Sequence, residues 1–168
     1  MVAAGPSIRS GGAMGAQPHA FFVYGTLKQG LSNYHLIADS VRAAMPATIR
    51  GRLYDVGPFP ALAAGDEPVR GEVLTVEPDA LPRLLAVLDR LEGYESGDLD
   101  GSIYIRRVVA ATTDDGRAVE AHAYFYNRDP GGLRHLPAGE WSGPSALEVA
   151  EGADELADFG RHVREFGR

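Results

Sequence analysis

Apolar and polar positions divide the chain into short stretches with different periods. The first strong stretch, residues 21–24, is a continuous apolar and aromatic run, which is typical of a buried strand. It ends at Gly25-Thr26, and Gly30 follows a few residues later. A glycine directly after a buried strand lets the backbone approach a ligand closely with free N–H groups. The loop that begins at Gly25 is therefore a candidate binding loop.

The pattern after this loop predicts more strands than helices. A short helix is expected over residues 33–41, and the clearest helix covers residues 80–92, with Asp79 as its cap and Gly93 as its end. Residues 58–68 contain three prolines and are expected to form a turn-rich loop. Alternating or apolar runs predict strands over residues 47–57 (with a bulge at Gly51), 69–76, 102–113 and 117–127, the last two joined by a hairpin turn at 114–116.

The two ends of the chain have a different texture. Residues 1–18 are rich in Gly, Ala, Ser and Pro without a continuous apolar run, so we expect a disordered leader rather than a signal peptide. Residues 19–128 form the expected domain. Residues 129–168 are expected to add a Gly- and Pro-rich loop and an amphipathic helix over residues 153–167. The order β-α-β-β-α-β-β with short turns predicts an α+β fold with a mixed, barrel-like sheet.

Composition narrows the range of partners. The 168 residues, 45% hydrophobic and 23% charged, are typical of one soluble globular domain. A net charge of −7 argues against a nucleic-acid partner, and no apolar run is long enough to span a membrane. The absence of cysteine excludes disulfides, thiolate nucleophiles and zinc–thiolate sites. We expect a cytoplasmic protein and take a monomer as the default state.

One carboxylate falls in an unusual place on the predicted helix. With about 100° per residue, the leucines of residues 81–91 form one stripe, and Glu92 falls inside it. Burial, the negative end of the helix dipole and the nearby Glu95 and Asp98 would all raise the pKa of such a glutamate. A glutamate with a raised pKa is suited to general-base catalysis near neutral pH. The alternative is that the helix unwinds before Glu92 and its side chain turns to water.

Other side chains give weaker signals. The five histidines show no i,i+3 or i,i+4 pairing, so a metal site is not expected. Glu72, on a predicted strand, is either a second pocket carboxylate or, more simply, a partner of Arg70 or Arg106. Tyr124, Tyr126 and His122 share one face of their strand and are expected to form a polar pocket wall.

Several motifs in a fixed order resemble those of the γ-glutamylcyclotransferase-like family, also called AIG2-like. They are FVYGTLKQG, SNYHLI, GRLYDVGPFPAL, VRGEVLTV, LDRLEGYE, YIRRVV and AYFYN, and they span residues 21–127. The resemblance implies a compact mixed β-barrel with flanking helices. It also implies an enzyme, of lyase or acyltransferase type, that cyclises a γ-glutamyl group to 5-oxoproline and releases an amine or amino acid.

The resemblance also assigns roles to individual residues. The family's catalytic glutamate corresponds to Glu92, the residue already singled out by the helical pattern. Its substrate-binding loop corresponds to residues 24–27, and further substrate-binding positions correspond to Tyr104, Arg106 and Tyr126. The substrate-binding residues implied by the resemblance are therefore Tyr24, Gly25, Thr26, Leu27, Tyr104, Arg106 and Tyr126.

The implied reaction needs only a folded γ-glutamyl chain, a base and stabilisation of an oxyanion. The expected partner is therefore a small-molecule γ-glutamyl compound, with no cofactor and no metal. Gly25 is expected to be a glycine because a Cβ would block the approach of the ligand. Two alternatives stay open: hydrolysis or transfer of a γ-glutamyl group in a biosynthetic pathway, and a protein that binds γ-glutamyl ligands without turnover.

Overall fold

The structure is a computed structural model that describes residues 17–143. Most of the expected leader and the expected C-terminal helix over residues 153–167 lie outside the described residues. The elements are β1 (Ala20–Val23), η1 (Tyr34–Leu36), η2 (Ala38–Ser40), β2 (Val41–Asp55), β3 (Pro60–Val76), η3 (Pro78–Ala80), α1 (Leu81–Glu92), β4 (Tyr104–Thr113), β5 (Ala118–Tyr126), η4 (Pro130–Gly132) and β6 (Arg134–His135).

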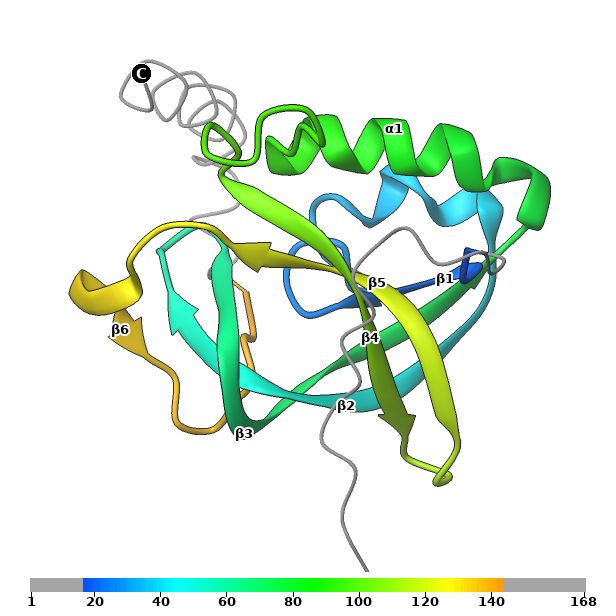
Figure 1. The fold of residues 1–168 in the computed structure, drawn as a ribbon. Helices are drawn as coiled ribbons and strands as arrows, with labels where there is room; N and C mark the ends of the chain where they lie inside the picture. The colour runs from blue at the N-terminus through cyan, green and yellow to red at the C-terminus, as the bar shows by residue number, and fades with distance from the viewer. Residues whose placement is uncertain (1–16, 144–168) are drawn as a thin grey trace, which may run out of the picture.

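Five strands close into a barrel. Their order is β3-β1-β5-β4-β2, and the long β2–β3 pairing completes the ring (Figure 1). Among the strands of residues 17–143, β1 and β5 run parallel, while the other neighbours are antiparallel. The short strand β6 adds to the edge of β2 near Tyr54. The predicted α+β fold with a mixed barrel is therefore confirmed.

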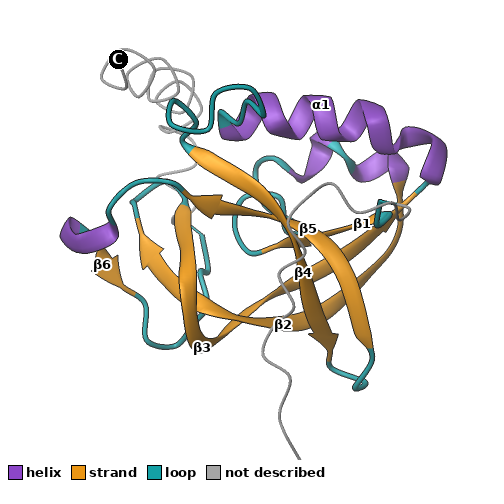
Figure 2. Ribbon diagram, viewed as in Figure 1, coloured by secondary structure: helices purple, strands orange, loops and turns teal. Residues whose placement is uncertain are grey.

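Helix α1 lies outside the barrel, across one end of it (Figure 2). Its buried residues Leu81, Leu84 and Leu88 pack against the outer faces of the strands in one of two hydrophobic clusters. The other cluster fills the barrel interior. Strand β1 contributes to both, because its successive side chains alternate between the interior and the helix side. Within residues 17–143, no helix has the length and apolar character needed to cross a membrane.

The local predictions have mixed outcomes. The bulge at Gly51 and the left-handed Gly93 at the end of α1 are confirmed, with φ of 65° at Gly93. The loop predicted for residues 58–68 is wrong, because β3 already begins at Pro60 and pairs with β2 on both sides of the bulge. Asp79 does not cap α1, since it lies within η3 and α1 begins without a side-chain cap. The short helix predicted over residues 33–41 is instead two single-turn 3-10 helices, η1 and η2, before β2 begins.

Candidate active site

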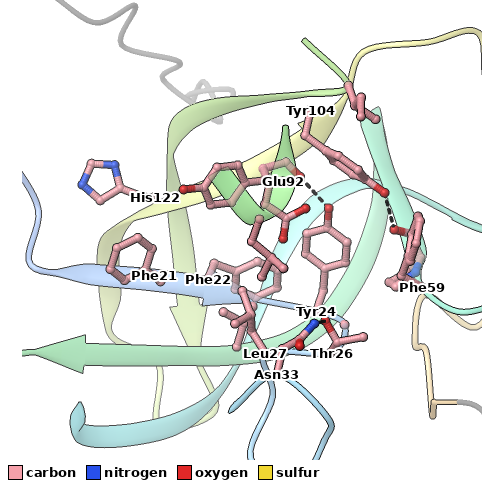
Figure 3. Close-up of a pocket in the computed structure, with 16 residues that line it drawn as sticks. Phe21, Phe22, Tyr24, Thr26, Leu27, Asn33, Phe59, Glu92, Tyr104 and His122 are labelled. Atoms are coloured by element: carbon pink, nitrogen blue, oxygen red, sulfur yellow. Dashed lines mark hydrogen bonds between the residues drawn. The ribbon is translucent and has the colours of Figure 1, made fainter. Parts of the chain in front are cut away.

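A cavity of about 310 Å³ opens where the end of β1 meets the last turn of α1 (Figure 3). Apolar and aromatic side chains form most of its wall, with few polar groups among them. The lining residues are Phe21, Phe22, Val23, Tyr24, Gly25, Thr26, Leu27, Asn33, Phe59, Pro60, Leu91, Glu92, Ile103, Tyr104, His122 and Tyr124. A largely apolar pocket with a few convergent polar groups is typical of a small-molecule site.

The loop after β1 is held in shape by its own hydrogen bonds. The Asn33 N–H donates to the Thr26 carbonyl at 2.9 Å, and the Asn33 side chain donates to the Thr26 hydroxyl at the same distance. The Lys28 N–H donates to the Gly25 carbonyl at 3.0 Å. Among residues 17–143, no acceptor is found for the N–H groups of residues 25–27. These three amides can therefore donate to an anionic group in the cavity.

The structure explains why residue 25 is a glycine, and the explanation differs from the expected approach of a ligand. A Cβ at Gly25 would lie 2.8 and 2.9 Å from the ring carbons of Pro60, the first residue of β3. The glycine therefore allows close packing between the loop and Pro60, which is itself part of the cavity wall. Substitution of Gly25 would disturb this wall before it met any ligand.

Glu92 is the last residue of α1 and its carboxyl points into the cavity. Because Gly93 ends the helix in a left-handed conformation, Glu92 stays helical and remains on the face that meets the barrel. Figure 3 shows its carboxyl directed toward the hydroxyl end of Tyr24. Burial raises the pKa of Glu92 from its ordinary value of 4.5 to about 7. The group is thus poised to exchange a proton near neutral pH.

Three tyrosines around Glu92 direct their protons elsewhere. The Tyr24 hydroxyl donates to the Tyr124 carbonyl, the Tyr104 hydroxyl donates to the Pro60 carbonyl at 3.0 Å, and the Tyr124 hydroxyl donates to Asp89 at 2.7 Å. Burial, followed by other causes that include the charge of Glu92, raises the pKa of each of these tyrosines. Because their protons are committed, these hydroxyls do little to stabilise Glu92 as an anion.

Two residues expected to bind substrate do not line the cavity. Arg106 lies on β4 behind the wall, where its guanidinium pairs with Asp89 and lies over the ring of Tyr94. Tyr126 packs edge-on against Tyr104, with ring centres 5.6 Å apart. The cavity therefore brings together Glu92, residues 24–27 and Tyr104, while Arg106 and Tyr126 stand behind it.

Two further candidates also have clear positions. His122 lines the cavity beside Phe21, and burial lowers its pKa to about 4, so it is neutral. Glu72 is not a pocket carboxylate: it accepts the Gln29 N–H at 2.8 Å and so supports the binding loop. In the part of the chain that the structure describes, no group of three or more His, Asp or Glu side chains is arranged to hold a metal ion.

Part of the cavity wall comes from residues that the sequence pattern did not indicate. Phe59 and Pro60 lie in the segment that was predicted to be a loop, and Asn33 was not singled out. The polar side chain of Asn33, seven residues after Thr26, was the available signal, because a short loop after a strand needs a side chain to close it.

Comparisons with known proteins agree on one family. Residues 21–143 match the family model described as gamma-glutamyl cyclotransferase, AIG2-like. The chain is 32% identical over 109 residues to the gamma-L-glutamyl-butirosin B gamma-glutamyl cyclotransferase of Niallia circulans, a match that covers 64% of this chain and 67% of that protein. It is 26% identical to the gamma-glutamylcyclotransferase family protein YtfP of Escherichia coli K12, over 71% of this chain and 93% of the relative.

A solved structure shows the same fold. The crystal structure of an AIG2-like protein from Mus musculus superposes with a TM-score of 0.54 at 21% identity, covering 77% of this chain and 92% of that one. The share of a relative's length that is matched varies widely and is only 40% for a Bacillus subtilis protein. The family model alone spans most of the chain, including every residue that lines the cavity. The chain belongs to the gamma-glutamyl cyclotransferase, AIG2-like, family.

Proposed function

We propose that the protein converts a γ-glutamyl compound to 5-oxoproline and a free amine. The α-amine of the γ-glutamyl group attacks its own γ-carbonyl, so that a new C–N bond closes a five-membered ring. The tetrahedral intermediate then collapses, the original C–N bond breaks, and the departing nitrogen takes up a proton. Both reacting groups belong to one molecule, so the protein has only to fold the chain, move a proton and stabilise the oxyanion.

Glu92 is the proposed proton carrier. The main support for this role is the position of its carboxyl in the cavity. An α-ammonium has an ordinary pKa of about 7.7–8.0, so a carboxylate with a pKa near 7 is well matched to accept its proton. The same carboxyl then gives this proton to the departing nitrogen and takes up the second proton that the ring nitrogen must lose as the lactam forms. The released amine carries this second proton away as an ammonium. These steps need no Lewis acid or redox group, so we expect the reaction to be metal-independent.

The loop over residues 25–27 is the proposed site for the negative charge of the substrate. Its three N–H groups can receive either the α-carboxylate or the developing oxyanion. Tyr24 and Tyr104 would form the walls around the glutamyl chain, and Tyr126 would support Tyr104 from behind. The Niallia circulans relative is named as a cyclotransferase acting on γ-L-glutamyl-butirosin B, which supports a γ-glutamyl compound as the substrate here.

The test is a screen of γ-glutamylamines and γ-glutamyl amino acids with 5-oxoproline and glutamate measured separately. We expect 5-oxoproline, in buffer treated with a chelator, and no reaction when the α-amine is acetylated. Release of glutamate would instead show hydrolysis, and binding without either product would show a binding protein. Cleavage of the acetylated substrate at the normal rate would contradict the proposal, because the α-amine could not then be the nucleophile.

A paired substitution tests the role of Glu92. Glu92→Gln preserves the shape of the side chain but cannot accept a proton, so we expect turnover to fall by about 10²–10⁴-fold. Glu95→Gln makes the same chemical change at an exposed glutamate three residues away and should leave turnover unchanged. A folded Glu92→Gln protein with normal activity would show that another group moves the proton.

A further inference from the structure

Arg106 contacts the chain on both sides of Glu92. Its Nη1 atom lies 3.5 Å from Oδ2 of Asp89, which is three residues before Glu92. The same guanidinium lies over the ring of Tyr94, two residues after Glu92, with its central carbon 5.4 Å from the ring centre. One side chain from β4 therefore contacts both the last helical turn and the residue that follows it. The contact with Asp89 is an ion pair rather than a hydrogen bond, since the buried Nη1 has no hydrogen-bond partner among the described residues.

Asp89 connects this arrangement to a second strand. Its Oδ1 accepts the Tyr124 hydroxyl from β5 at 2.7 Å, while its Oδ2 faces Arg106 on β4. The Tyr94 N–H also donates to the Asp89 backbone carbonyl at 2.8 Å. The end of α1 is thus fastened to two neighbouring strands, and Glu92 lies within the fastened segment.

The contacts are sheltered from solvent. The side chains of Arg106 and Asp89 are only 18% and 23% exposed, so their attraction is less screened than that of a surface pair. Both the planar stacking on Tyr94 and the pairing with a carboxylate suit arginine better than lysine. Because Arg106 is absent from the cavity wall, its charge is directed to the helix end rather than to a bound molecule.

We propose that Arg106 is a positioning residue, which acts with Asp89, Tyr94 and Tyr124 to fix the Glu92 carboxyl in the cavity. This inference rests on the proposed function, since it concerns the base of that reaction. The titratable groups that face Glu92 or lie next to this cluster come from all the packed elements. They are Tyr24 after β1, Asp89 on α1, Tyr94 after α1, Tyr104 and Arg106 on β4, and His122 and Tyr124 on β5.

Steady-state kinetics separate positioning from substrate binding. In Arg106→Gln we expect kcat to fall by about 10–100-fold with KM changed less than about threefold, because a small displacement of the base slows the chemical step. Arg106→Lys keeps the charge but loses the planar stacking, and it should recover part of this loss. A rise in KM with unchanged kcat would overturn the proposal and show that Arg106 contacts the substrate.

Direct titration of Glu92 tests the same proposal without turnover. The carboxyl carbon of Glu92, assigned by its loss in Glu92→Gln, can be followed by NMR as pH changes. In Arg106→Gln we expect its midpoint to fall from near 7 toward 4.5, because a loosened carboxyl gains water. An unchanged midpoint would overturn the proposal. This measurement holds even if no γ-glutamyl compound is turned over, so failure of the reaction and failure of the positioning role are distinguishable.

The matched control is the next residue on the same strand. Arg107 also stacks on an aromatic ring, that of Phe125 at 5.3 Å, but it lies on the opposite side of β4 from Arg106. Arg107→Gln should leave kcat and the Glu92 midpoint unchanged. If Arg106→Gln does not fold, Tyr94→Leu removes the stacking partner and is expected to lower the midpoint in the same direction. Equal effects in the Arg106 and Arg107 variants would overturn the proposal.

Discussion

The barrel interior and the space between the barrel and α1 are both hydrophobic, but they are built from different residues. The interior contains five buried alanines, among them Ala121 and Ala123, which leave room for large side chains to cross a narrow barrel. In the part of the chain that the structure describes, the cluster under α1 contains no buried alanine and instead includes Tyr104 and Tyr124. Within the described residues, the interior cluster gives only Phe22 and Tyr24 to the wall of the cavity that holds Glu92, whereas the cluster under α1 gives it five of its buried residues, Phe21, Val23, Leu27, Tyr104 and Tyr124.

This difference shows where an ionisable group can be placed. A carboxylate deep in the barrel interior would need partners on every side, because desolvation of an unpaired charge is very costly. At the edge of the second cluster, Glu92 is desolvated enough to raise its pKa but can still reach a ligand. The interior therefore provides stability, and the helix–barrel boundary provides chemistry.

The largest effect on stability is expected from a substitution that disturbs the barrel interior. A Cβ at Gly71 on β3 would lie 2.3 Å from the Val23 carbonyl and 2.7 Å from the Phe22 ring, so β1 would have to move. We expect Gly71→Ala to lower the free energy of unfolding by about 4 kcal/mol or more. Urea denaturation measures this. Gly132→Ala, where a Cβ meets nothing within 4 Å, should be nearly neutral, and equal costs would contradict the argument.

Glu92, at the boundary between the barrel and α1, should make the free energy of unfolding depend on pH. The pKa of Glu92 is raised on folding from 4.5 to about 7, so its contribution favours the folded state below pH 4.5 and is lost as pH rises toward 7. His122, whose pKa is lowered to about 4, acts in the opposite direction. Relative to wild type, Glu92→Gln should therefore gain about 2–3 kcal/mol between pH 4 and pH 8. Urea unfolding of both proteins at several pH values measures the difference, and a flat difference would contradict the assigned pKa.

A smaller effect is expected from overfilling the interior. Ala123 is fully buried on β5, so Ala123→Val should cost about 1–3 kcal/mol of stability. Because the side chain of Ala123 belongs to the interior cluster and does not itself line the cavity, kcat per folded molecule should be unchanged. Thermal unfolding and active-site-normalised kinetics together check both statements. A change in kcat without a change in stability would show that the two regions are coupled more tightly than their packing indicates.

The smallest effect on stability is expected at the cavity mouth. Leu91 is 42% exposed, so Leu91→Ala should change stability by less than about 0.5 kcal/mol. It lines the cavity, however, and should raise KM by a few-fold. Leu99→Ala, at a leucine that is 48% exposed but outside the cavity, is the matched control. If KM changes equally in both variants, the mouth does not contact the substrate.

The sequence predicted the elements whose pattern is local. The apolar run of β1, the leucine stripe of α1 and the β4–β5 hairpin all form as expected, and Gly93 ends the helix. The first half of β3 was missed because Pro60, Gly65 and Pro68 are local turn signals. In the barrel, the long pairing with β2 and complete burial of Leu62 override them.

The sequence could identify the main residues of the candidate site but not the full geometry of the cavity. Glu92 follows from the helical period, but Leu91, on the same stripe, is exposed because the last turn forms the cavity mouth. Tyr104 and Arg106 share a face of β4 by alternation, yet only Tyr104 reaches the cavity. The alternation along a strand predicts on which face of the sheet a residue lies. It does not predict which part of the covering helix that residue meets.

Strand β1 also has a consequence for biosynthesis. It leaves the ribosome first among the strands, but its neighbours are β3 and β5, and Tyr24 bonds to the carbonyl of a residue 100 positions later. Its four residues cannot pair on both edges until most of the domain has been made, which is a slow kind of contact to form. Half of the cavity wall comes from this early segment and the loop after it. A nascent chain that ends before β5 can pair β1 with β3, but it lacks the strand that supplies His122 and Tyr124 to the cavity wall.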